Sequence, residues 1–104
     1  MPPMKRLELH NQLVDTLGSS AVYFQPPESV KLQYPCIIYN LSYVDTTSAD
    51  NLPYINHYRY LVTLITRNPD DPLIEAIKNL PQCKFDRYFT SDQLHHYSYE
   101  ITMI

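Results

Sequence analysis

The fold is decided by residues 36–66, which read CIIYNLSYVDTTSADNLPYINHYRYLVTLIT. The first nine residues are mostly apolar or aromatic, and large side chains recur at every second position from Ile37 to Tyr43, as in a buried strand. The β-branched and aromatic residues 57–66 alternate in the same way. The sequence therefore predicts two neighbouring strands that pair antiparallel.

Between these strands, residues 45–56 form a polar stretch in which turn-forming residues dominate and periodicity is lost. The stretch is longer than a tight hairpin needs. We therefore expect a long mobile loop at the end of the strand pair. Asp45 and Asp50 flank this loop, where solvated carboxylates are the ordinary interpretation.

Toward the N-terminus, residues 3–17 predict a helix that ends at Gly18, the only glycine of the chain, where a left-handed cap is needed. Residues 21–25 predict a short strand, which the following Pro26 and Pro27 stop. The apolar face expected for the helix consists of Leu7, Leu13, Val14 and Leu17.

Toward the C-terminus, residues 67–72 predict a turn in which an Asp cap and Pro72 begin a second helix. Pro81 ends this helix. Residues 83–90 predict a strand and residues 96–104 another, which alternates almost strictly. The predicted apolar stripe of the helix is Leu73, Ile74, Ile77 and Leu80, and one face of the first strand holds Cys83, Phe85, Arg87 and Phe89.

The predicted order is α-β-β-β-α-β-β over a single domain, residues 1–104. Because most connections are hairpins, we expect a mostly antiparallel sheet of about five strands with both helices on one face. This is a two-layer α+β sandwich. The other face carries enough tyrosine and apolar residues to be sticky, which is a liability in a monomer and an interface in a ring.

Composition narrows the classes of function. Tyr occurs 10 times and Trp never, and Tyr suits both half-buried strands and protein interfaces. The net charge is −3 and no basic patch is visible, which argues against binding nucleic acid through phosphates. A weakly acidic surface is compatible with DNA passing close by without sticking. No apolar run approaches the roughly 20 residues of a membrane helix, and the N-terminus lacks the apolar core of a signal peptide.

Candidate chemical groups have simpler structural explanations. Neighbours in an extended segment point to opposite faces, so His95 and His96 make a poor chelate. Asp70 and Asp71 stand where a helix is capped. We expect reduced, buried thiols at Cys36 and Cys83, with a disulfide as the less favoured interpretation. The sequence leaves open a pairing of Cys83 with His96 across the last hairpin, but overall it predicts no enzyme, no metal and no cofactor.

Five stretches, in order and with compatible spacing, resemble one family. They are residues 17–27 (LGSSAVYFQPP), 34–39 (YPCIIY), 59–70 (RYLVTLITRNPD), 80–87 (LPQCKFDR) and 92–96 (DQLHH). The family is that of the tail terminator, or tail completion, proteins of bacteriophages with long, flexible, non-contractile tails. The resemblance spans roughly Leu13 to His96.

This resemblance implies a structural virion protein with an α+β sandwich fold and no catalytic residues. Such proteins form a homo-hexameric ring on the last ring of the major tail tube protein, stop tube growth, and then bind the head-completion proteins of the neck. The location implied is the tail–head junction of the virion, assembled in the host cytoplasm, with DNA passing through the ring.

Within this interpretation we expect the loop 45–56 to contact the tail tube or to line the lumen. Its candidate contact residues are Asp45, Thr46, Thr47, Asp50, Asn51 and Tyr54. The connection around Pro26, Pro27 and Glu28 is a second candidate contact. Two alternatives remain open, namely another neck component such as a head-closure or adaptor protein, and a prophage-encoded protein that binds a host target.

Overall fold

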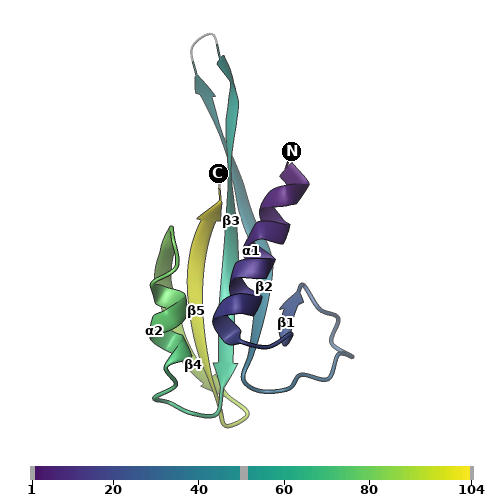
Figure 1. Cartoon of the computed structure of the whole chain (residues 1–104), viewed down its shortest axis with the longest axis vertical. Helices are drawn as coiled ribbons and strands as arrows, with labels where there is room; N and C mark the ends of the chain where they lie inside the picture. Colours follow the sequence, from purple (N-terminus) through teal and green to yellow (C-terminus); the bar gives the residue numbers. More distant parts are fainter. Residues whose placement is uncertain (1, 50–51, 104) are drawn as a thin grey trace.

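The structure is a computed structural model that describes the backbone of residues 2–49 and 52–103, and the side chains of residues 6–44 and 57–103. It is an α+β fold with the predicted order α-β-β-β-α-β-β (Figure 1). The elements are α1 (Pro2–Leu17), β1 (Val22–Phe24), β2 (Cys36–Ala49), β3 (Leu52–Thr66), α2 (Leu73–Lys78), β4 (Cys83–Ser91) and β5 (Leu94–Met103).

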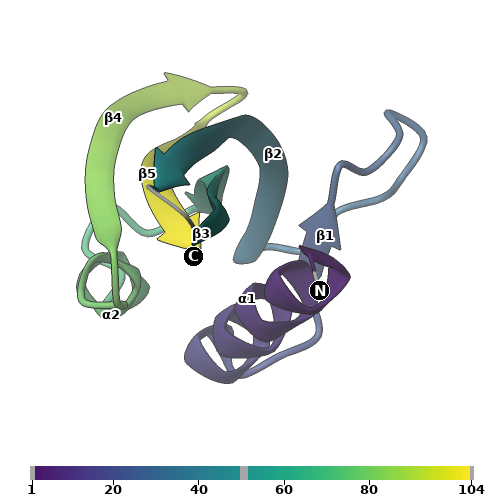
Figure 2. The same ribbon diagram turned by 90° about the horizontal axis from the view of Figure 1, so that it is seen from above.

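The five strands form one sheet in the order β1-β2-β3-β5-β4. All neighbours pair antiparallel except β1 and β2, which pair parallel over three residues. Both helices lie on the same side of the strongly twisted sheet, and the described chain places no helix on the other side (Figure 2). The predicted two-layer, mostly antiparallel architecture is confirmed.

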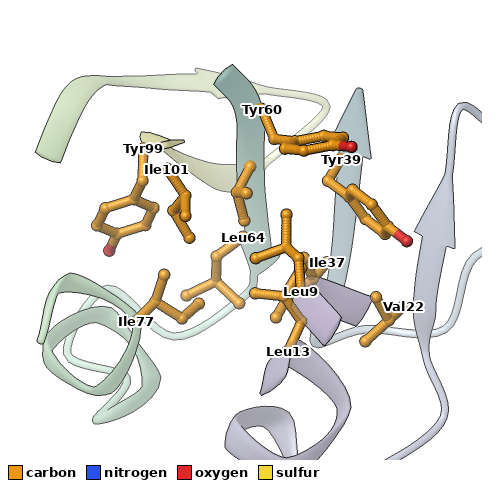
Figure 3. Packing of buried hydrophobic residues seen from close by; sticks show 11 residues of the cluster. Leu9, Leu13, Val22, Ile37, Tyr39, Tyr60, Leu64, Ile77, Tyr99 and Ile101 are labelled. Carbon is orange, nitrogen blue, oxygen red and sulfur yellow. The ribbon is translucent and has the colours of Figure 1, made fainter. Parts of the chain in front are cut away.

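The core fills the space between the helices and one face of the sheet (Figure 3). Leu9 and Leu13 of α1 and Ile77 of α2 are fully buried against the sheet. From the strands, the core receives Val22, Ile37, Tyr39, Tyr60, Val62, Leu64, Tyr99 and Ile101. Tyr60, Val62 and Leu64 are every second residue of β3 and all lie in this core, which agrees with the alternation predicted for residues 57–66.

The predicted apolar face of α1 was wrong in one residue. Leu7 is 44% exposed, whereas Leu9 is fully buried. At 3.6 residues per turn, Leu7 lies about 120° around the helix from Leu13, while Leu9 lies only about 40° away. Leu9 and Leu13 therefore share the buried face, and Leu7 cannot reach it.

The predicted end of α1 and the predicted start of α2 are confirmed, whereas α2 ends at Lys78, three residues before the predicted stop at Pro81. Gly18 has a φ of 76° and its backbone N–H donates to the Val14 carbonyl at 2.9 Å, so the chain leaves α1 through a left-handed residue. At the start of α2, the carboxylate of Asp71 accepts from the Leu73 backbone N–H at 2.9 Å and from the Thr66 hydroxyl at 2.8 Å. Asp71 thus caps the helix and ties it to the end of β3.

Two of the three register shifts in the sheet change the strand faces that simple alternation predicts. One lies between Leu41 and Tyr43 in β2, and the other lies between Phe85 and Arg87 in β4. Each shift inserts one extra residue, so the residues beyond it change sides. Phe89 consequently lies opposite His96, on the side without helices, and not on the side of Phe85 as predicted.

No helix among the described residues is long and apolar enough to cross a membrane.

Candidate interaction surfaces

The hairpin of β2 and β3 continues beyond the rest of the sheet as a two-stranded arm (Figure 1). Among the described residues, pairing of β3 with β5 ends at Tyr58, and from Asp45 and His57 outward β2 and β3 pair only with each other. We call the described residues 45–49 and 52–57 the arm. It stretches the molecule to 52 × 26 × 23 Å and raises the radius of gyration to 14.7 Å, against about 13 Å for a compact domain of this length.

The arm replaces the irregular loop predicted for residues 45–56. Thr46 lies opposite Asn56, Thr47 opposite Ile55, and Ala49 opposite Leu52, so strands continue through most of the stretch. Hydrophobic alternation is the main sequence signal for a half-buried strand, and this alternation is lost in residues 45–56. The β-branched and aromatic residues here were the available signal for a strand.

The structure distributes the predicted contact residues of this stretch over both strands. Asp45, Thr46 and Thr47 belong to β2, Tyr54 belongs to β3, and Asp50 and Asn51 lie outside the described residues. The four described residues thus belong to the arm.

The second predicted contact lies elsewhere on the molecule. Pro27 and Glu28 are exposed and Pro26 is half-buried, in the connection between β1 and the start of β2. The Val30 N–H donates to the Pro27 carbonyl at 3.1 Å, which closes a turn. Because this connection precedes β2 while the arm follows from its far end, the two predicted contacts do not form one surface (Figure 1).

Sequence reasoning missed two exposed apolar patches. Apart from Leu7, every exposed large hydrophobic side chain of the described chain lies on β2 or β4, with exposed fractions of 41 to 52%. The β2 patch consists of Leu41, Tyr43 and Val44, and the β4 patch consists of Phe85, Tyr88 and Phe89. The sequence predicted an apolar surface over the open face of the sheet. The exposed apolar side chains instead follow two strands, β2 and β4.

Both patches lie where a strand edge is free. β4 is the last strand of the sheet, and nearly all its side chains are exposed. β1 covers β2 only from Ile37 to Tyr39, after which the Gln25 side chain accepts from the Leu41 N–H at 3.2 Å. Beyond Leu41, the described chain places no strand on that side of β2.

A shallow pocket of about 260 Å³ joins the β4 patch on the helix side. Half of its lining residues are aromatic, and Glu75 and Lys78 of α2 supply its charges. Tyr99 donates its hydroxyl to the Ile74 carbonyl at 2.8 Å, so the polar tip of this buried ring is satisfied. The lining residues are Ile74, Glu75, Lys78, Phe85, Tyr97 and Tyr99.

The side chains of the two adjacent histidines lie on different faces of the β4–β5 hairpin, as the extended backbone predicts. The His95 ring stacks on Tyr88, and its Nδ1 lies 2.7 Å from the Tyr88 hydroxyl oxygen. The His96 ring stacks on Phe89, with ring centroids 4.6 Å apart. Each histidine therefore packs beside an aromatic side chain of the exposed edge.

The thiols are not arranged for nucleophilic chemistry. Both Cys36 and Cys83 are free, and burial raises the pKa of each thiol to about 11, so both are neutral near pH 7. Cys83 lies opposite Ile101, whereas His96 lies opposite Phe89 at the other end of the hairpin. The pairing of Cys83 with His96 that the sequence left open is absent. Within the described ranges, no group of three His, Cys, Asp or Glu residues could hold a metal ion.

Comparison with known proteins finds no family model that matches the sequence, and no curated protein matches it. The interpretation of these surfaces therefore depends on their geometry and on the sequence motifs.

Proposed function

We propose that this chain is a structural protein of a tailed bacteriophage, a tail terminator of a long non-contractile tail. Copies of the chain form a ring on the end of the tail tube, stop its elongation and bind the neck of the head. The proposal starts from the five ordered motifs that resemble the terminator family. The α+β fold agrees with the architecture that this resemblance implies.

The observation that carries the proposal is the arm. An isolated two-stranded ribbon is marginal in water, and this one leaves the sheet to which β3 otherwise contributes buried core residues. Such an extension reaches beyond the body of the sheet and can order against a neighbouring protein. We assign it to the contact with the tail tube.

The electrostatics are compatible with this role. The chain carries a net charge of −3, so a ring of several copies does not attract DNA phosphates, and DNA can pass through it without being held. No base reading or catalysis is required of a subunit whose task is to join two assemblies.

Electron microscopy of lysates from a phage with an early stop codon in this gene tests the proposal. We expect filled heads beside unattached tails, many of them overlong. Filled heads with detached tails of uniform length would indicate a different joining protein, such as a head-closure protein. Intact infectious virions would overturn the structural role and favour a protein directed at a host target.

An arm-deletion variant tests the assignment of the arm. Replacing residues 46–56 by Asn-Gly joins Asp45 to His57, which lie opposite each other, through a two-residue turn. The variant should fold, with a cooperative urea unfolding transition, yet fail to rescue the stop-codon phage. Leu7→Ala, an exposed change on α1, is the matched control and should restore normal yield. A normal phage yield from the arm-deletion variant would refute the assignment.

A further inference from the structure

We infer that the free edges of β2 and β4 are the two halves of one head-to-tail contact between copies of this chain, in which β4 of one copy pairs antiparallel with β2 of the next. The β2 patch and the β4 patch meet across this contact. The inference deepens the proposed function, since ring closure depends on it, but the edge contact itself is a property of the chain alone.

The positions of the two patches carry the argument. They lie on opposite sides of the β3–β5 pair in the sheet order, and each follows a strand whose outer side is free at that point. A two-fold contact joins a patch to itself, so a β4-to-β4 dimer would leave the β2 patch exposed. A head-to-tail contact uses two different patches and covers both.

Strand direction fits this pairing. Successive pairs β2–β3, β3–β5 and β5–β4 are all antiparallel, so β2 and β4 run in opposite directions within one subunit. The registers place the β4 patch level with residues 36–39 of β2, part of whose outer edge β1 covers, and the β2 patch lies further along the strand. A rotation about an axis inclined to the strands shifts the next copy along them, so that the two patches meet. It brings β4 of one copy antiparallel to β2 of its neighbour and continues the sheet from subunit to subunit.

The composition of the two faces also matches. Leu41 and Val44 lie opposite Tyr60 and Tyr58, on the helix side of the sheet, while Tyr43 lies opposite Arg59 on the other side. On β4 the division is the same: Phe85 and Tyr88 lie on the helix side and Phe89 on the other. When the edges join, each face brings apolar side chains from both copies together.

The exposed area indicates a weak contact in isolation. Three large side chains that are a little under half exposed present on the order of 300 Å² per patch. Both patches together give roughly 600 Å², below the roughly 900 Å² of apolar area in a standard interface of about 1,600 Å². The bulges at the two edges also discourage indiscriminate strand pairing. Free subunits should thus stay largely monomeric and join firmly only when a ring closes.

Cross-linking with a short bismaleimide tests the pairing, because a covalent trap captures weak contacts. Val44→Cys and Tyr88→Cys, on the same side of the sheet, are made separately in a Cys83→Ser background, since Cys36 is fully buried. Concentrated mixtures of the two variants should give a cross-linked dimer at least tenfold above either variant alone. Leu7→Cys mixed with Tyr88→Cys is the control for an equally exposed site and should stay at background.

A chain that carries both cysteines should give a ladder of dimers, trimers and higher species. Cross-linked dimers from Tyr88→Cys alone would overturn the proposal in favour of a two-fold β4 contact. Failure of the mixture to exceed the Leu7→Cys control, both in concentrated protein and in phage lysates, would also overturn it. A ladder from a chain whose stop-codon phage assembles normally would keep the edge contact and refute the tail role.

Discussion

The helix side of the sheet and its two free edges use the same residue types, but their burial differs completely. Tyr39 and Tyr99 are fully buried beneath the helices, whereas Tyr43 and Tyr88 are 52% and 48% exposed. The buried pair uses its hydroxyls within the subunit, on His10 and on the Ile74 carbonyl. The comparison teaches that one chain buries its own core but leaves a second apolar surface exposed. This surface lies along strand edges that another molecule can cover.

The largest effect should come from truncating the covered side. Leu13→Ala removes a fully buried side chain from the contact of α1 with the sheet, and should lower the free energy of unfolding by about 3 kcal/mol. Urea denaturation measures this loss. Leu7→Ala on the same helix is the control, with a change within about 0.5 kcal/mol because Leu7 is exposed. Equal losses of unfolding free energy at both positions would contradict the description of Leu13 as buried and Leu7 as exposed.

A smaller effect separates buried and exposed tyrosine hydroxyls. Tyr99→Phe removes the donor to the Ile74 carbonyl and should cost about 1 kcal/mol. Tyr88→Phe removes an exposed contact with His95 and should leave the urea midpoint nearly unchanged. Both variants keep their rings, so the difference isolates the hydroxyl. A larger loss for Tyr88→Phe would show that the free edge contributes to folding after all.

The smallest effect concerns the turn that joins the exposed edge strand to β5. Asp92 and Gln93 both have positive φ, 52° and 65°, where glycine is favoured. Gln93→Gly should therefore stabilise the hairpin by about 0.5 kcal/mol in thermal or urea unfolding. Asp70→Gly, in an exposed turn where no positive φ is present, should not stabilise the protein. A destabilised Gln93→Gly variant would contradict this description of the turn.

The sequence predicted the elements that form the core under the helices better than it predicted the free strand edges and the arm. Alternation in β3 and β5, the left-handed Gly18 and the cap at Asp71 all depend on local chemistry or on a buried face. The arm was predicted as a loop because turn-forming residues dominate residues 45–56 and hydrophobic alternation is lost there. The faces of β4 were wrong because a bulge leaves no reliable signal in a single sequence.

The candidate contacts show the same limit. Polar turn-forming residues pointed to residues 45–56 as the projecting segment, which agrees with the position of the arm. The β2 and β4 patches were not predicted. The exposure of Tyr43 or Phe85 depends on which strand lies beside it, and the order of strands in a sheet cannot be inferred from the residues of one strand. The aromatic residues interleaved with Lys84, Asp86 and Arg87 were the one available hint of an exposed strand.

The central claim is that one chain buries its own core, whereas the free edges of β2 and β4 gain hydrogen-bonded partners only on assembly. Amide hydrogen exchange tests this claim most directly. In the free protein, amides of residues 58–66 of β3, which have a strand on each side, should exchange slowly, and outward amides of β4 should exchange fast. In isolated virions, the account predicts strong added protection in β4 and in residues 41–44, with little change in residues 58–66. Protection of those edges that is the same in the free and assembled protein would contradict it.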